Sequence, residues 1–131
     1  MPSEMNFEKQ GRGVLVTWTG SVTGKEIKDV NRAIYAPDRL ARLCYQIWDF
    51  TQARQLDVTN EDVRYFAMQD KAAAKQNPNV IAALVGTPSF FRGYERIFAI
   101  YAQIWRGFET KVFSTVSEAR AWVANIFPSL V

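Results

Sequence analysis

Stretches with the residue pattern of β-strands alternate with stretches of helical spacing along the whole chain. Two alternating runs come first, Met5–Gln10 and Val14–Thr19, and the Gly11-Arg12-Gly13 link between them is typical of a β-hairpin. Strands and helices then alternate to the C-terminus, which favours parallel pairing because parallel strands need a crossover connection. The sequence therefore predicts an α/β fold with a mostly parallel sheet and an N-terminal antiparallel hairpin strand.

The elements after the hairpin are marked by helix caps and by breaks at Pro and Gly. They are a helix capped by Thr23 and stopped by Pro37, a strand at Leu43–Phe50, a helix from Thr59 or Asn60 to about Gln76, a strand at Val80–Val85, a long helix from Ser89 to about Arg106, a strand at Thr110–Ser114 and a last helix capped by Ser117. The order is β-β-α-β-α-β-α-β-α. Because 131 residues is an ordinary domain size, we expect a single domain over residues 1–131.

The absence of His and the low number of Cys exclude several classes of functional site. The chain has no His and one Cys, which excludes a disulfide framework, a zinc site within the chain and any catalytic group that relies on imidazole. A net charge of +3 gives no reason to expect a nucleic-acid partner. No targeting signal or membrane-spanning run is present, and the free Cys44 suits a reducing compartment, so a soluble cytoplasmic protein without a cofactor is expected.

The expected helix from Ser89 to about Arg106 carries the strongest functional signal. At helical spacing, aromatic side chains gather on one arc, which we call the aromatic face: Phe90, Tyr94, Phe98, Tyr101 and Trp105. An adjacent arc of Ile97, Ile100 and Ile104 is sufficient to pack on a sheet, so the aromatic face needs another partner. Packing within the chain, self-association and an apolar ligand pocket are the three interpretations of this face.

Asp70 is predicted to lie on an apolar stripe of its helix, formed by Val63, Ala67 and Ala74. A carboxylate on a buried face must be paired, hydrogen-bonded or protonated. The favoured interpretation is a hydrogen bond to a backbone amide or an inward-reaching Arg, and the alternative is a polar anchor inside a pocket.

Two further carboxylates are associated with the strand expected at Leu43–Phe50: Asp49 at its carboxyl end and Asp57 just beyond it. If Asp49 ends that strand at its carboxyl end, where open α/β sheets bind ligands, the two groups could lie together and bind Mg²⁺ or act as a base. No further residue completes such a site, and turn capping is the commoner role of Asp at a strand end.

Several short segments resemble the STAS fold of anti-sigma-factor antagonists and sulfate transporter tails, and most closely the bacterial stand-alone STAS/SEC14-like proteins. The matching segments are Gly20-Ser21-Val22-Thr23-Gly24, Tyr45-Gln46-Ile47-Trp48-Asp49, Leu56 to Val63, Asp70-Lys71-Ala72-Ala73-Ala74, Val112-Phe113 and Ser117 to Val123. The resemblance covers nearly the whole chain and implies a regulatory protein-interaction domain, with lipid carriage as the analogy to the SEC14-like proteins.

In the antagonists a Ser in an Asp-Ser-Ser-Gly turn is phosphorylated at the start of the second helix. The corresponding turn here is Asp57-Val58-Thr59-Asn60, in which Val58 occupies the acceptor position and the Gly is missing. Thr59 is the one hydroxyl of this turn. Helix capping is the favoured role of Thr59, and a phosphorylated switch is the alternative.

Together these observations predict a non-catalytic regulatory or interaction module, homo-oligomeric through the aromatic face or bound there to a protein partner. The runner-up is a carrier or sensor of an apolar or amphiphilic small molecule, with the same aromatic side chains lining a cavity. An enzyme is the least favoured class, because so few catalytic side chains are present.

Overall fold

The strands of the sheet lie side by side in the order in which they occur in the chain, β1-β2-β3-β4-β5. The computed structural model describes residues 3–104 and 108–130, and its strands are β1 (Ser3–Glu8), β2 (Gly13–Thr23), β3 (Tyr45–Asp57), β4 (Ile81–Val85) and β5 (Glu109–Phe113). β1 pairs antiparallel with β2, and every later neighbour pairs parallel. The predicted α/β class, with its N-terminal hairpin strand, is confirmed.

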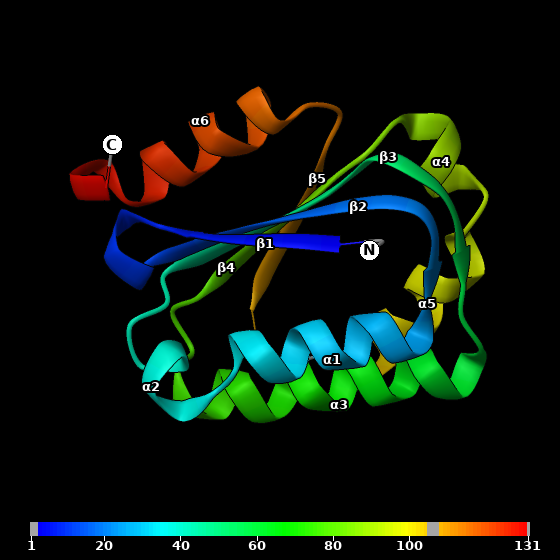
Figure 1. Ribbon diagram of the computed structural model, residues 1–131, viewed down its shortest axis with the longest axis horizontal. Helices are drawn as coiled ribbons and strands as arrows, with labels where there is room; N and C mark the ends of the chain where they lie inside the picture. The colour runs from blue at the N-terminus through cyan, green and yellow to red at the C-terminus, as the bar shows by residue number, and fades with distance from the viewer. Residues whose placement is uncertain (1–2, 105–107, 131) are drawn as a thin grey trace.

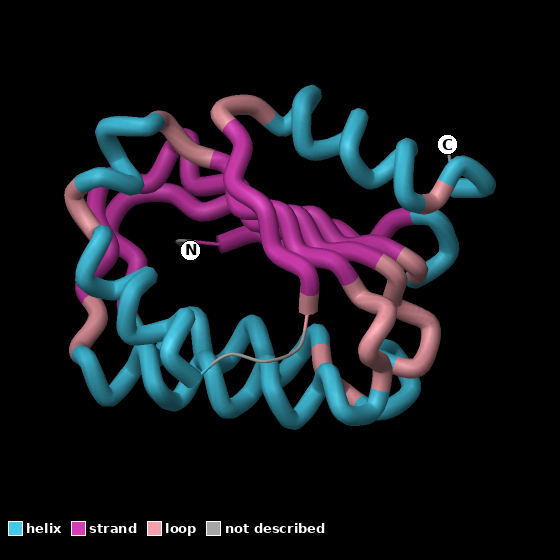
Figure 2. The backbone as a smooth tube through the Cα atoms, turned by 180° about the vertical axis from the view of Figure 1, so that it is seen from behind, coloured by secondary structure: helices cyan, strands magenta, loops and turns pink. Residues whose placement is uncertain are grey.

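Helices cover both faces of this sheet (Figure 1). They are α1 (Gly24–Ile34), α2 (Pro37–Leu40), α3 (Asn60–Gln76), α4 (Pro88–Arg92), α5 (Glu95–Ile104) and α6 (Val116–Ile126), with 3₁₀ turns at Lys9–Gly11 and Pro128–Leu130. α1 and α3 run side by side beneath one face, and α6 crosses the other, as the view from behind also shows (Figure 2). α5 packs mainly on α3.

Successive residues of a strand point to opposite faces of the sheet, so alternate side chains are buried in two separate hydrophobic cores, one on each face. On the α1 and α3 side, Val14, Val16 and Trp18 of β2 are fully buried. On the α6 side, Tyr45 and Ile47 of β3 are buried in the smaller cluster. Odd-numbered residues in the first half of β3 therefore face α6, and even-numbered ones face α1 and α3.

The helix starts follow local cap chemistry. Thr23 and Thr59 each accept a hydrogen bond from the backbone three residues on, in capping boxes completed by Glu26 and Asp62, so both predicted starts are confirmed. The predicted cap of the last helix was wrong. Thr115 caps α6 by accepting from the backbone N–H of Glu118, so the helix begins before Ser117.

β3 extends seven residues beyond the predicted strand end at Phe50. Among the described residues, the segment from Gln52 to Asp57 pairs only with the end of β2; one register shift comes just before this segment and a second falls within it. Such irregularities bend a strand and increase its twist. Figure 1 shows the result, since β2 and β3 curl together away from the sheet to reach the starts of α1 and α3.

The long helix expected from Ser89 to about Arg106 is instead broken into α4 and α5. A turn at Gly93 and Tyr94 separates the two, and Gly has one of the weakest helix propensities. The break lets α4 stand over the curled end of β3 while α5 lies along α3 (Figure 1).

Candidate functional site

A cavity of about 400 Å³ lies between the sheet and the α3 and α5 side of the molecule. Trp48, Phe50 and Leu84 form its sheet wall, and the curled end of β3 adds Leu56, followed by Val58. The helical side contributes Ile27 and Asn31 of α1, Val63, Phe66 and Asp70 of α3, and Ile97, Phe98 and Tyr101 of α5. Most of these side chains are apolar. α5 packs mainly on α3, and the cavity lies between these helices and the sheet.

The described residues of the aromatic face have contacts within the chain. Phe90 stacks on Phe50 with ring centroids 5.8 Å apart, and the hydroxyl oxygen of Tyr94 accepts the backbone N–H of Leu56 at 2.9 Å. The Phe98 ring lines the cavity.

Tyr101 lines the cavity beside Phe98 and donates its hydroxyl to Asp70. Trp105 lies outside the described residues. Phe90 and Tyr94 thus fit the interpretation of packing within the chain, whereas Phe98 and Tyr101 fit the interpretation of a pocket wall.

Asp70 accepts hydrogen bonds on both carboxylate oxygens. The Tyr35 hydroxyl donates to Oδ1 at 2.6 Å, and the Tyr101 hydroxyl donates to Oδ2. Behind Tyr35, Gln46 Nε2 donates to the Tyr35 oxygen at 3.1 Å, and Trp48 Nε1 donates to Gln46 Oε1 at 2.7 Å. Every bond in this series points its donor toward Asp70, so the carboxylate is the final acceptor of a network that joins α3, α5 and β3 with Tyr35, the residue that follows α1.

This arrangement corrects one expectation about Asp70. Its place on an apolar stripe is confirmed, since Val63, Ala67 and Ala74 are all buried. Its partners are neither a backbone amide nor an Arg but two tyrosine hydroxyls, which come from residues 35 and 31 positions away in the chain. No local spacing connects Asp70 with either tyrosine.

Burial raises the pKa of Asp70 to about 6, although the hydrogen bonds from Tyr101 and Tyr35 act to lower it. Burial, together with the neighbouring Asp70 charge, raises the pKa of both tyrosines well above the ordinary value of 10. The tyrosines therefore stay protonated donors at neutral pH, and Asp70 is mostly ionised there.

Asn31 is a cavity residue that sequence reasoning missed. It is 2% exposed, and its Nδ2 donates to Gln69 Oε1 at 3.0 Å. Its Oδ1 has no hydrogen-bond partner among the described residues. A signal was present in the sequence, because Asn31 follows Ile27 by four residues and interrupts the apolar face of α1.

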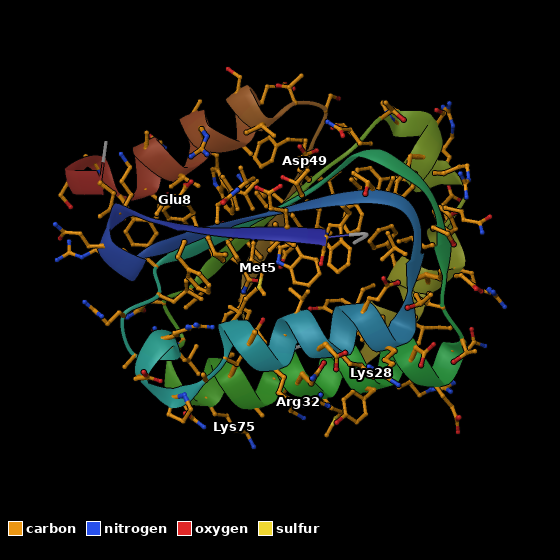
Figure 3. All side chains as sticks on the ribbon, viewed as in Figure 1. Met5, Glu8, Lys28, Arg32, Asp49 and Lys75 are labelled. Carbon is orange, nitrogen blue, oxygen red and sulfur yellow. The ribbon has the colours of Figure 1, made fainter. Side chains whose placement is uncertain are left out.

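Asp49 and Asp57 do not form a joint site. Asp49 lies in the middle of β3 on the α6 side of the sheet (Figure 3), and its Oδ1 accepts from the Thr51 amide at 3.0 Å and the Thr51 hydroxyl at 2.7 Å. Asp57 ends the same strand and is exposed. Seven residues of β3 separate Asp49 from Asp57, so the expectation that the two carboxylates lie together was wrong. It failed because β3 continues past Asp49.

Thr59 uses its hydroxyl to cap α3, accepting from the Asp62 amide at 3.1 Å. Its phosphorylation stays a prediction.

Within residues 3–104 and 108–130 no group of three or more His, Cys, Asp or Glu could hold a metal ion. No helix in that part of the chain is long and apolar enough to cross a bilayer.

Comparison with known proteins gives matches only among solved structures. No family model matches the chain, and no curated protein matches it. The anti-sigma factor antagonist SpoIIAA in its unphosphorylated form superposes with a TM-score of 0.59 at 11% identity, over 92% of this chain and 96% of that one. The phosphorylated form of SpoIIAA, described as a Bacillus cell fate determinant, gives 0.54 at 13% identity, over 92% and 98%. The chain therefore has a STAS-like fold.

Proposed function

We propose that this protein is a non-catalytic STAS-like regulatory module that binds a small apolar or amphiphilic molecule in the cavity between the sheet and α5. The cavity itself carries the proposal. Its volume of about 400 Å³ falls in the range of roughly 300–1,000 Å³ that is usual for small-molecule sites. Its walls are mainly apolar, with a few polar groups, which is the composition expected of such a site.

The walls also suggest how a bound molecule would affect the rest of the protein. α5 contributes Ile97, Phe98 and Tyr101 to the cavity. It is tied to α3 by the hydrogen bond between Tyr101 and Asp70. A molecule that contacts both α5 and the sheet would stabilise α5 in its present position, and a partner protein could respond to that position.

A cavity-filling substitution tests this proposal. Ala82 of β4 is 9% exposed and lines the cavity, so Ala82→Leu would extend its side chain into space that the ligand needs. The exposed Ala72 of α3 provides the matched control, Ala72→Leu. Native mass spectrometry of freshly purified wild type should show a co-purified small molecule, which Ala72→Leu retains and Ala82→Leu loses.

A medium-chain probe provides the second readout. Titration with 1-decanol, followed by intrinsic tryptophan fluorescence, to which the cavity residue Trp48 contributes, should give saturable binding to wild type and at least tenfold weaker binding to Ala82→Leu. If the protein carries no molecule in any preparation and decanol does not bind, the cavity is not a ligand site.

Interaction with another protein chain is the second candidate function. Two observations favour it: the fold is shared with an anti-sigma factor antagonist, and the four described residues of the aromatic face all keep part of their surface exposed. In light scattering, self-association through this face predicts a wild-type dimer that Phe98→Asp makes monomeric. Arg96→Asp, a charge change at an exposed position of the same helix, should stay dimeric. A monomeric wild type at high micromolar concentration would contradict self-association.

A further inference from the structure

Asp70 brings a negative charge to a cavity wall that holds no positive one. It lines the cavity beside Tyr101, whose hydroxyl donates to its carboxylate. None of the described lining residues is Lys or Arg, and no described residue forms an ion pair with Asp70. Its hydrogen-bond partners, the hydroxyls of Tyr35 and Tyr101, are neutral. A charge removed from water is costly unless an opposite charge accompanies it, so a cation brought by a ligand would stabilise this carboxylate.

The carboxylate of Asp70 also has the capacity to accept further hydrogen bonds. Its Oδ1 accepts from the Tyr35 hydroxyl at 2.6 Å, and its Oδ2 accepts from the Tyr101 hydroxyl. The two oxygens of a carboxylate offer about four lone-pair positions, so two tyrosine donors leave about two of them. A ligand N–H can therefore be accepted while both tyrosine bonds remain.

The rest of the wall suits a cation that carries a hydrocarbon chain. Trp48, Phe66 and Phe98 line the cavity together with Tyr101. The face of an aromatic ring carries partial negative charge and attracts a cation, and the same rings offer apolar surface to a hydrocarbon chain. A carboxylate or phosphate group would instead meet the like charge of Asp70 with no compensating cation among the described lining residues.

We propose that the cavity selects a primary ammonium amphiphile, whose ammonium group donates to the carboxylate of Asp70 and supplies its counter-charge while the hydrocarbon part lies against Trp48, Phe66 and Phe98. This inference rests on the proposed ligand-binding function and adds the chemical class of the ligand. At neutral pH the carboxylate is mostly in the ionised form that such a ligand requires, because the pKa of Asp70 is about 6.

A ligand series on the wild-type protein tests the chemical class without any substitution. The probes are decylammonium, 1-decanol and decanoate, which differ at the polar end, and calorimetric titration at mildly alkaline pH measures their affinities. Decylammonium should bind about tenfold more tightly than decanol, the effect expected when a hydrogen bond becomes a charged one, and decanoate should bind most weakly. Equal affinity for decylammonium and decanol, or tighter binding of decanoate, would overturn the inference.

The overall charge of the protein cannot produce the expected order of affinities. The net charge is +3, so the long-range field favours the anionic decanoate over the cationic decylammonium. A preference for the cation must therefore come from a local site.

Two variants then locate that site. Asp70→Asn should remove the preference for decylammonium over decanol, with a much smaller effect on the affinity for decanol itself. Asp38→Asn is the matched control, because it makes the same change of charge at an exposed residue that does not line the cavity, and it should keep the preference. If Asp70→Asn keeps the full preference, the carboxylate does not bind the ammonium group.

Lowering the pH gives a second readout on the wild-type protein. Because the pKa of Asp70 is about 6, only about a tenth of this carboxylate is ionised at pH 5 in the free protein. Decylammonium keeps its charge there, since alkylammonium groups such as that of Lys have a pKa of about 10. Its affinity should therefore fall about tenfold from mildly alkaline pH to pH 5, while the affinity for decanol changes far less. Unchanged binding of decylammonium would contradict the assignment to Asp70.

The groups around Asp70 leave its own titration as the cause of such a change. Tyr35 and Tyr101 contact it, and both stay protonated at these pH values because their pKa values are raised well above 10. Gln46 and Trp48 of β3, which continue the network, do not titrate. On α1, Lys28 and Arg32 are paired with the carboxylates of Asp62 and Asp29.

The possible failures can be told apart. If none of the three probes binds, the cavity is not a ligand site and the proposed function falls together with this inference. If decanol binds as tightly as decylammonium, the ligand-binding function stands and only the assignment of an ammonium ligand is wrong. Should Asp70→Asn fail to fold, the probe series and its pH dependence on the wild-type protein still decide between these results.

Discussion

The carboxyl group of Asp70 is held between two tyrosine hydroxyls in a largely apolar environment. Ionised, it accepts from Tyr35 and Tyr101 at the same time, so one side chain links three helical segments that are distant in the sequence. Burial nevertheless favours the protonated form, which is why its pKa lies near 6 instead of near the ordinary 3.8. Protonation at mildly acidic pH would turn one carboxylate oxygen into a hydroxyl donor that faces the tyrosine hydroxyl from which it had accepted.

The raised pKa of Asp70 predicts how stability changes with pH. Between about pH 4 and pH 6 the folded state keeps a proton that the unfolded state has lost, so the contribution of this group is greatest below pH 4 and is lost as pH rises through 6. The difference corresponds to about 3 kcal/mol, because each tenfold change in acid dissociation is about 1.4 kcal/mol. Urea denaturation of wild type and Asp70→Asn across this range measures it. The variant should lack the decline, and parallel profiles would show that Asp70 does not titrate as stated.

At the scale of the elements, α3 depends on its first turn. The Thr59 hydroxyl and the Asp62 carboxylate satisfy each other's backbone amides, and Asp62 also pairs with Lys28 of α1 at 2.8 Å. The side chains of Lys28 and Asp62 are both mostly buried. This ion pair therefore joins the start of α3 to α1, in addition to the cap. Since Val58 and Val63, on either side of the cap, both line the cavity, the same turn helps to define one end of it.

Thr59→Ala should lower the free energy of unfolding by about 1 kcal/mol, the usual effect of removing a helix cap. Thr59→Ser keeps the hydroxyl and should be close to wild type. Chemical denaturation monitored by circular dichroism measures both variants. An alanine variant as stable as wild type would mean that the hydroxyl is not the cap, and the phosphorylated-switch alternative for Thr59 would then gain weight.

Cap positions such as Thr23 and Thr59 could be predicted from the sequence, because the residues that make a capping box lie within four positions of each other. The position of Asp70 on a buried stripe could be predicted for the same reason. Its tyrosine partners could not, since they come from other helical segments. The extension of β3 was also missed. Its polar residues resemble a loop, and only pairing with β2 makes them a strand.

Considered as a whole, the molecule has a cavity of about 400 Å³ on the α3 and α5 side of the sheet and a smaller one, of about 120 Å³, beside α6. α6 closes directly on one face of the sheet, where Ala119 and Val123 pack on Ile47 and Ala83. On the other face, α5 lies on α3 and the cavity remains beneath it. A molecule bound there would add contacts to α5 and the curled end of β3 and none to α6.

Hydrogen exchange should reflect this asymmetry. With 1-decanol bound, amides that exchange through local openings should slow in α5 and in the 52–57 segment of β3, while those of α6 stay unchanged. The exchange rates are measured by mass spectrometry with and without the alcohol, and Ala82→Leu should show no difference between the two conditions. Slower local exchange in α6 alone would place the bound alcohol on the wrong face.

The strand order of the sheet also bears on how the chain reaches its structure. Each strand after the first pairs with the one synthesised just before it, so no strand has to wait for a partner that is still to be made. Contacts between successive elements require shorter loop closures than contacts between distant ones, which favours rapid folding. The strand order therefore keeps each loop closure of this sheet to one connection between successive strands, and α6, the last of the described α-helices, covers the second face.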